Sequence, residues 1–185
     1  MVKTNINLFA EGEVAYTDGG VLAEFAWVLV VLPFIAALII TFAGKSLPLK
    51  GAEIALGTIG IIFIYSLSLM YLHVTEGVAN EFFINVGNFG QFDIEFGWVV
   101  DGLSIMMYFV VGLVALLVFI YATNYMEGEI RYTFFFTSLT LFAGSMLVLV
   151  SSPTLIQILI GWELVGVCSY LLIGHYWEVK DNSSA

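Results

Sequence analysis

Five apolar runs, each long enough to form a membrane-spanning helix, constrain this chain more than any other feature. They cover residues 21–43, 53–74, 103–125, 133–150 and 154–176. A helix rises about 1.5 Å per residue, so about 20 apolar residues cross the roughly 30 Å of hydrocarbon in a bilayer. Hydrophobic residues make up 61% of the 185 and charged residues only 11%. The chain is therefore predicted to be an all-α polytopic membrane protein of about five helices.

The first apolar run is expected to be retained as a helix. It follows a polar segment, residues 1–20, whereas a signal peptide has a short basic start and a shorter apolar core. Pro33 lies inside this run, and a kink there is tolerable in a membrane if neighbouring groups satisfy the freed carbonyl. The predicted organisation is a polar segment 1–20, two helices within 21–75, an outer loop 76–102, three helices within 103–176 and a tail 177–185.

The distribution of charge predicts the orientation in the membrane. With five spans, one side holds Lys45, Lys50, Arg131 and Lys180, and the other side holds only Lys3. The positive-inside rule makes the first side cytoplasmic, so the amino terminus is expected outside and the tail inside. The net charge of −10 excludes nucleic-acid binding, which needs basic patches to neutralise phosphates. Cys168 is the sole cysteine, which excludes an intrachain disulfide and argues against redox chemistry within this chain.

The longest connection, residues 76–102, carries the pattern of a β-hairpin. Apolar and polar residues alternate over 91–98 and again over 82–87, with turn-forming residues at 87–90. A two-stranded hairpin is marginal in water, and its free edge invites pairing or packing with another chain. Two interpretations stay open: the hairpin binds a partner, or it merely lies over its own helices.

Glu163 is the strongest candidate for a functional residue. It is the single formal charge in the run 154–176, and ionisable groups near the bilayer midplane usually face a protein interior or water. Burial favours the protonated form of a carboxyl group and a nearby cation favours the ionised form, so a moving lysine could load and release a proton there. Helical spacing places Leu159, Ile160, Gly166, Val167 and Tyr170 on or beside the same face, with Gly166 leaving room for a partner helix. The alternative is a permanently protonated Glu163 bonded to a backbone carbonyl.

The other polar residues have plainer interpretations. Asp101 directly precedes the third run, where it can cap the helix start, although a role in a proton path stays open. His73 and His175 lie at span ends and are interpreted as interfacial rather than catalytic. Gly112, Gly144, Gly161 and Gly166 are the small residues expected where membrane helices approach closely.

Three stretches of the sequence resemble a known family. Residues 162–174 read Trp-Glu-Leu-Val-Gly-Val-Cys-Ser-Tyr-Leu-Leu-Ile-Gly, residues 100–104 read Val-Asp-Gly-Leu-Ser, and residues 124–126 read Asn-Tyr-Met. They are similar to the largest antiporter-like membrane subunit (subunit 5, or chain L) of proton-pumping NADH:quinone oxidoreductase, respiratory complex I. The related large subunit of multisubunit Na⁺/H⁺ antiporters is less similar across residues 165–170.

The resemblance implies a function that the residues alone do not. Glu163 matches a glutamate thought to pair with a lysine on a later, broken helix during proton transfer, and Asp101 matches a motif position of less certain role. The resemblance also implies that the hairpin joins the neighbouring antiporter-like subunit. NADH, FMN, iron–sulfur clusters and quinone are then bound by other subunits, and no cofactor or metal is expected in this chain.

The length of the chain is where it departs from the family. Members carry well over a dozen helices, so the sequence looks like an amino-terminal fragment that includes the start of one antiporter-like repeat, and a complete proton path is not expected from it. The resemblance implies a bacterial plasma membrane, with the mitochondrial inner membrane as the alternative. The alternatives in function are a subunit of a Na⁺/H⁺ antiporter and a non-transporting membrane assembly module.

Overall fold

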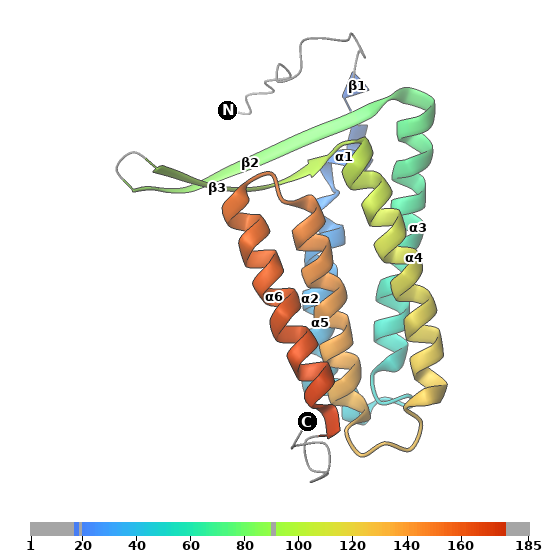
Figure 1. Ribbon diagram of the computed structural model, residues 1–185. Helices are drawn as coiled ribbons and strands as arrows, with labels where there is room; N and C mark the ends of the chain where they lie inside the picture. Colours follow the sequence, from blue (N-terminus) through green and yellow to red (C-terminus); the bar gives the residue numbers. More distant parts are fainter. Residues whose placement is uncertain (1–16, 19, 90–91, 177–185) are drawn as a thin grey trace.

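The computed structural model describes residues 17–18, 20–89 and 92–176, and it forms a bundle of long helices beneath a β-hairpin (Figure 1). The five long helices are α2 (Trp27–Ala43), α3 (Ala52–Glu76), α4 (Gly102–Tyr125), α5 (Tyr132–Ser151) and α6 (Leu155–Ile173). Short 3₁₀ turns follow α2 and α6, at Gly44–Ser46 and Gly174–Tyr176. Each of the five is long and apolar enough to cross a membrane, which confirms the predicted fold class.

The core lies between the helices rather than around a sheet. α5 is the most enclosed helix, because it packs against α2 and α6 and also contacts α3 and α4, while α3 packs mainly against α4. Three of the four expected glycines mark close approaches: Gly112 of α4 faces the backbone of Phe63, Gly144 of α5 faces Pro33 and Phe34, and Gly161 of α6 faces the backbone of Leu149. Small residues let backbones approach, which membrane helices need because lipid provides no hydrophobic drive between them.

The first predicted span differs from the structure at its outer end. Residues 21–43 were expected to form one helix, but α1 (Gly20–Glu24) ends before α2 begins at Trp27. The separation is a tight turn, in which Val28 N donates to Phe25 O and Leu29 N donates to Ala26 O. Pro33 is buried inside α2, which continues through it to Ala43.

The outer loop forms the expected hairpin. Strand β2 (Val78–Phe89) pairs antiparallel with β3 (Phe92–Val100), and Phe82 stacks on Trp98 with ring centroids 4.3 Å apart. β2 continues to Phe89, through most of the turn expected at residues 87–90, and residues 90 and 91 lie outside the described part of the chain. A short strand β1 (Thr17–Asp18) adds to the free side of β2 in parallel, which the sequence pattern did not predict.

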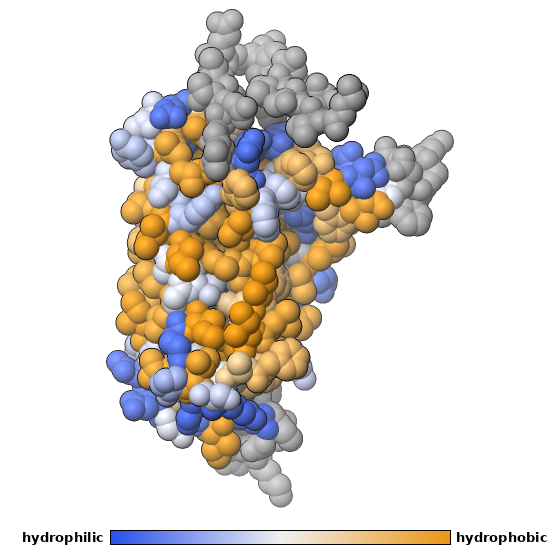
Figure 2. All heavy atoms as spheres, turned by 180° about the vertical axis from the view of Figure 1, so that it is seen from behind, coloured by the Kyte–Doolittle hydropathy of each residue, from blue (hydrophilic) through white to orange (hydrophobic). Residues whose placement is uncertain are grey.

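The surface is apolar along the bundle and hydrophilic at its two ends, as Figure 2 shows for one face. One end carries the hairpin, which extends sideways beyond the helices, and the other carries the α2–α3 and α4–α5 connections (Figure 1). We call these the hairpin end and the loop end. The described basic side chains of Lys45, Lys50 and Arg131 all belong to the loop end, as the charge pattern predicted. The residues of the predicted tail, 177–185, lie outside the described part.

Candidate functional site

Glu163 lies near the middle of α6, at its ninth residue, and its side chain is exposed. The helix begins where it does because Pro153 disfavours a helical residue before it and Thr154 follows as the N-cap. Thr154 Oγ1 accepts a hydrogen bond from Gln157 N at 3.4 Å. At about 1.5 Å per residue, Glu163 is roughly 12 Å from the helix start, a depth well inside the hydrocarbon layer.

One face of α6 packs on α5, and Glu163 is not on it. The packed face presents Gln157, Gly161 and Cys168, all buried. Gly161 lies against the backbone of Leu149, and Cys168 Sγ lies 3.7 Å from Ser145 Oγ. Cys168 therefore contributes to helix packing as a small apolar residue.

The face of α6 that carries Glu163 is uncovered by the described helices. Trp162 is 67% exposed and Tyr170 is 76% exposed, with Leu159 and Val167 exposed between them. A Cβ added at Gly166 would meet nothing within 4 Å, so the room expected beside Glu163 is present. The interior in which a membrane carboxylate is expected is thus not formed by the described residues alone. Chemically, this face presents an ionisable group to whatever packs on α6.

Two residues at the start of α6, which no motif in the sequence marks, tie that helix to the hairpin. Gln157 Oε1 accepts from Gly97 N at 2.9 Å, and Gln157 Nε2 donates to Gly97 O at 2.8 Å. Thr154 Oγ1 donates to Glu95 O at 3.1 Å. The available signal was a lone amide side chain inside an apolar run, which must find partners if buried.

Asp101 is the N-cap of α4. Its Oδ1 accepts from Ser104 N at 2.7 Å, which is the capping geometry that the sequence favoured. The structure does not bring Asp101 and Glu163 together: α4 packs on α3 and α6 packs on α5. Two further polar side chains hold the hairpin near Asp101. His73 Nδ1 lies 2.7 Å from Val78 O, and Tyr108 OH donates to Val99 O at 3.1 Å.

The two histidines lie at opposite ends of the bundle. His73 is in the last turn of α3, at the hairpin end, and its hydrogen bond to the Val78 backbone is a structural contact. His175 follows α6 at the loop end and packs edge-on against Phe135. Burial lowers the pKa of His175, while nearby Glu129 raises it and Arg131 lowers it. The position of His73 at the end of a span and its hydrogen bond to the backbone fit the interfacial interpretation made from the sequence.

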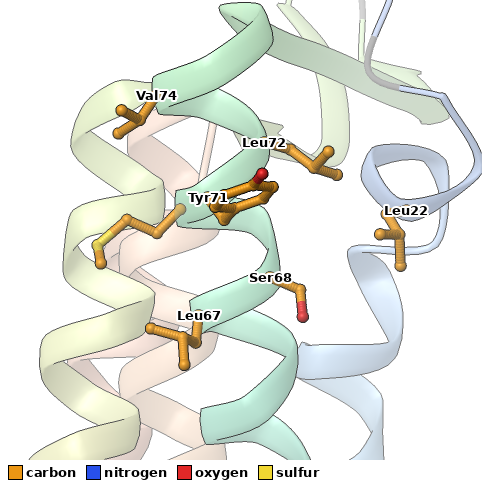
Figure 3. A pocket seen from close by; sticks show the side chains of 7 residues that line it. Leu22, Leu67, Ser68, Tyr71, Leu72 and Val74 are labelled. Carbon is orange, nitrogen blue, oxygen red and sulfur yellow. The ribbon is translucent and has the colours of Figure 1, made fainter.

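One hollow on the surface of the bundle lies away from Glu163, on α3 rather than α6. It is an open apolar groove of about 690 Å³ at the hairpin end of α3, with Leu22 of α1 at its side (Figure 3). Its side chains on α3 include Leu67, Ser68, Tyr71, Leu72 and Val74. It faces the surface of the bundle and holds no carboxylate. Within residues 20–89 and 92–176, no group of three or more His, Cys, Asp or Glu side chains gathers as metal ligands would.

Comparison with known proteins agrees with the resemblance in the sequence. Residues 86–136 match the family model described as NADH-Ubiquinone oxidoreductase (complex I), chain 5 N-terminus. NAD(P)H-quinone oxidoreductase chain 5 of Picosynechococcus sp. is 37% identical over 172 residues, which are 89% of this chain and 26% of that one. Subunit 5 of the chloroplast enzyme of Chlorokybus atmophyticus is 38% identical over 168 residues, 87% of this chain and 26% of that one.

A solved structure shares the fold. It is a chain of the membrane-bound sulfane sulfur reductase, an archaeal respiratory membrane complex, with a TM-score of 0.69 over 86% of this chain and 32% of that one, at 12% identity. That identity supports the fold alone. The chain spans about a quarter of the length of the curated relatives it matches. Over nearly all of its own length the chain is similar to subunit 5 of the NAD(P)H-quinone oxidoreductases, and residues 86–136 match the model for the amino-terminal part of that family.

Proposed function

We propose that this chain is the amino-terminal portion of a proton-translocating membrane subunit, which couples NADH oxidation and quinone reduction to proton transport. The observation that carries the proposal is the position of Glu163, a carboxyl group at mid-membrane depth on a helix face that the described residues leave open. The names of the relatives, which are subunits of NAD(P)H-quinone oxidoreductases, supply the reaction.

Glu163 acts in this proposal as a proton-transfer group rather than as a redox group. A carboxyl group in low dielectric holds its proton until a cation approaches, because the ionised form needs a compensating charge. The described basic side chains lie at the loop end, and none of them is on α6. The cation must therefore come from outside the described residues, and we assign it to a lysine on a later helix. NADH, FMN, iron–sulfur clusters and quinone are bound by other subunits.

The hairpin is proposed to bind the neighbouring antiporter-like subunit. Beside and beyond its contact with α6, the hairpin exposes apolar side chains on both faces of β2: Phe82, Phe83, Ile84 and Val86. Exposure of apolar side chains to water on both faces of a strand is unfavourable, and such a surface is typical of a contact with another protein. The part near the helices does lie over its own bundle, where Val78 and Val100 are buried, so the two interpretations from the sequence apply to different halves of the hairpin.

The proposed location is a bacterial plasma membrane with the hairpin end outside. The clustering of Lys45, Lys50 and Arg131 at the loop end supports a cytoplasmic loop end. The described apolar belt between the two ends supplies the contact with lipid (Figure 2).

The decisive experiment replaces Glu163 with Gln in the full-length protein within its complex. Gln keeps the shape and hydrogen-bonding capacity of a protonated Glu but cannot release a proton. We expect Glu163→Gln to assemble and oxidise NADH while moving fewer protons into membrane vesicles per NADH. The matched control is Glu127→Gln, an exposed carboxylate at the loop end, which should pump as wild type. Wild-type pumping by Glu163→Gln would leave Glu163 a structural residue and favour a non-transporting assembly role.

A further inference from the structure

Among the described residues, Gln157 forms the one buried side-chain hydrogen-bonded link between the hairpin and the first turn of α6. Its amide group closes a ring with Gly97, accepting from the backbone N–H at 2.9 Å and donating to the carbonyl at 2.8 Å. Gln157 itself is only 6% exposed. Both polar atoms of a planar amide are thus engaged by a single residue 60 positions away in the sequence, which fixes the direction as well as the distance of the contact.

The geometry of β3 explains why this ring forms at Gly97. Gly97 lies opposite Phe83 in the antiparallel pair, and its N–H and C=O point away from β2 toward α6. Glu95 O, two residues earlier, points to the same edge and accepts from Thr154. The start of α6 therefore covers the free edge of β3. A side chain at residue 97 is excluded, because its Cβ would lie 1.9 Å from Phe82 O.

Beyond this contact, α6 is held mainly by van der Waals packing, which does not fix the rotation and depth of the helix as hydrogen bonds do. It is the least buried of the five spans, and it packs mainly on α5. Its deeper contacts there are the Gly161 backbone against Leu149 and the Cys168 thiol near Ser145. Van der Waals contacts between small residues allow a helix to turn or slide by small amounts, whereas a two-bond amide ring does not.

We propose that Gln157 is the positioning residue for Glu163: by locking α6 to Gly97, it sets the rotation and depth at which Glu163 meets its proton-transfer partner. Six residues separate the two, about 9 Å of helix and 240° of rotation, with no proline between them. In a straight helix, a rotation of the axis at Gln157 turns Glu163 by the same angle. This inference rests on the proposed function, and it links the hairpin, and whatever binds it, to the proton-transfer residue.

The test uses the full-length protein in its assembled complex and measures proton uptake into membrane vesicles per NADH oxidised, with the amount of complex determined on native gels. Gln157→Leu removes both hydrogen bonds at similar volume, and Gln157→Glu, when ionised, has no donor for Gly97 O. Cys168→Ala is the control, since it changes a buried contact of the same helix away from the hairpin. We expect both Gln157 variants to lose about half or more of the pumping that Glu163→Gln loses. The control should pump as wild type.

A double variant separates positioning from general damage. If Gln157 acts through Glu163, Gln157→Leu combined with Glu163→Gln should pump no less than Glu163→Gln alone, because the step being positioned is already absent. Wild-type pumping by both Gln157 variants, losses that add in the double variant, or failure of both variants to assemble would each overturn the proposal. Wild-type pumping by Glu163→Gln alone would instead overturn the proposed function, whatever the Gln157 variants do.

Discussion

Gly161 of α6 lies so close to Leu149 of α5 that a Cβ on residue 161 would stand 3.0 Å from both the Cα and the N of Leu149. This close contact between the two helices lies one turn beyond Gln157. It holds the covered face of α6 against the bundle and leaves the opposite side, with Glu163, uncovered. The one glycine therefore helps to decide which way Glu163 faces.

Gly161→Ala is predicted to destabilise the protein. The added methyl group must push α5 and α6 apart, and such overpacking typically costs about 1–3 kcal/mol. Gly57→Ala is the control, because a Cβ at Gly57 in α3 would meet nothing within 4 Å, and replacing Gly in a helix gains roughly 0.5–1 kcal/mol. Thermal unfolding in detergent should show a lower midpoint for Gly161→Ala only. Equal midpoints for the two variants would contradict the close contact.

Charged substitutions in the hairpin are predicted to weaken assembly without preventing insertion. Phe83 is 45% exposed and Val86 is 65% exposed, so each can bury its side chain against a partner, a gain of about 1.5–3 kcal/mol per residue. Phe83→Asp with Val86→Asp should reduce the share of the chain found in the intact complex on native gels. Asn85→Asp, which adds a charge between them without removing an apolar group, should assemble normally. Normal assembly of the double variant would reject the contact surface.

Two substitutions at Asp101 separate capping from proton transfer. Asp101→Ala removes the acceptor for Ser104 N and should cost about 1 kcal/mol of stability. Asp101→Asn keeps an acceptor oxygen in the same place but cannot carry the proton. If Asp101 is only a cap, Asp101→Asn should unfold and pump as wild type while Asp101→Ala unfolds at a lower temperature. Lost pumping in Asp101→Asn, with unchanged stability, would instead assign Asp101 to a proton path.

The bilayer and the pleat of a strand explain how much of this fold the sequence could predict. The length of an apolar run is set by membrane thickness, so α3, α4, α5 and α6 lie within a few residues of their predicted bounds. The hairpin followed from alternation, because successive strand residues point to opposite faces. Asp101 followed from a local rule, since a cap and the amide it serves are three residues apart.

What the sequence could not predict depends on pairs of distant residues. The turn at Phe25–Ala26 interrupts a run that is apolar apart from Glu24, and one charge beside the predicted end of a span does not predict a turn there. β1 joins β2 across about 60 residues, and Gln157 meets Gly97 across a similar separation. Periodicity on one segment carries no information about which other segment it will meet. Glu163 could be identified as a lone membrane carboxylate, but the open face beside it appears only when the helices are packed.

The orientation of the bundle can be tested directly in intact cells, after Cys168 has been replaced by Ala. Ser46, beside Lys45, and Asn85 in β2 are exposed positions at opposite ends of the bundle, so each accepts a single cysteine without disturbing the core. The excess of basic residues at the loop end predicts that this end is cytoplasmic. An impermeant thiol reagent added outside should therefore label Asn85→Cys in intact cells and label Ser46→Cys only after the cells are opened. Labelling of Ser46→Cys but not of Asn85→Cys in intact cells would reverse the assignment and place the hairpin, with the edge that Gln157 holds, on the cytoplasmic side.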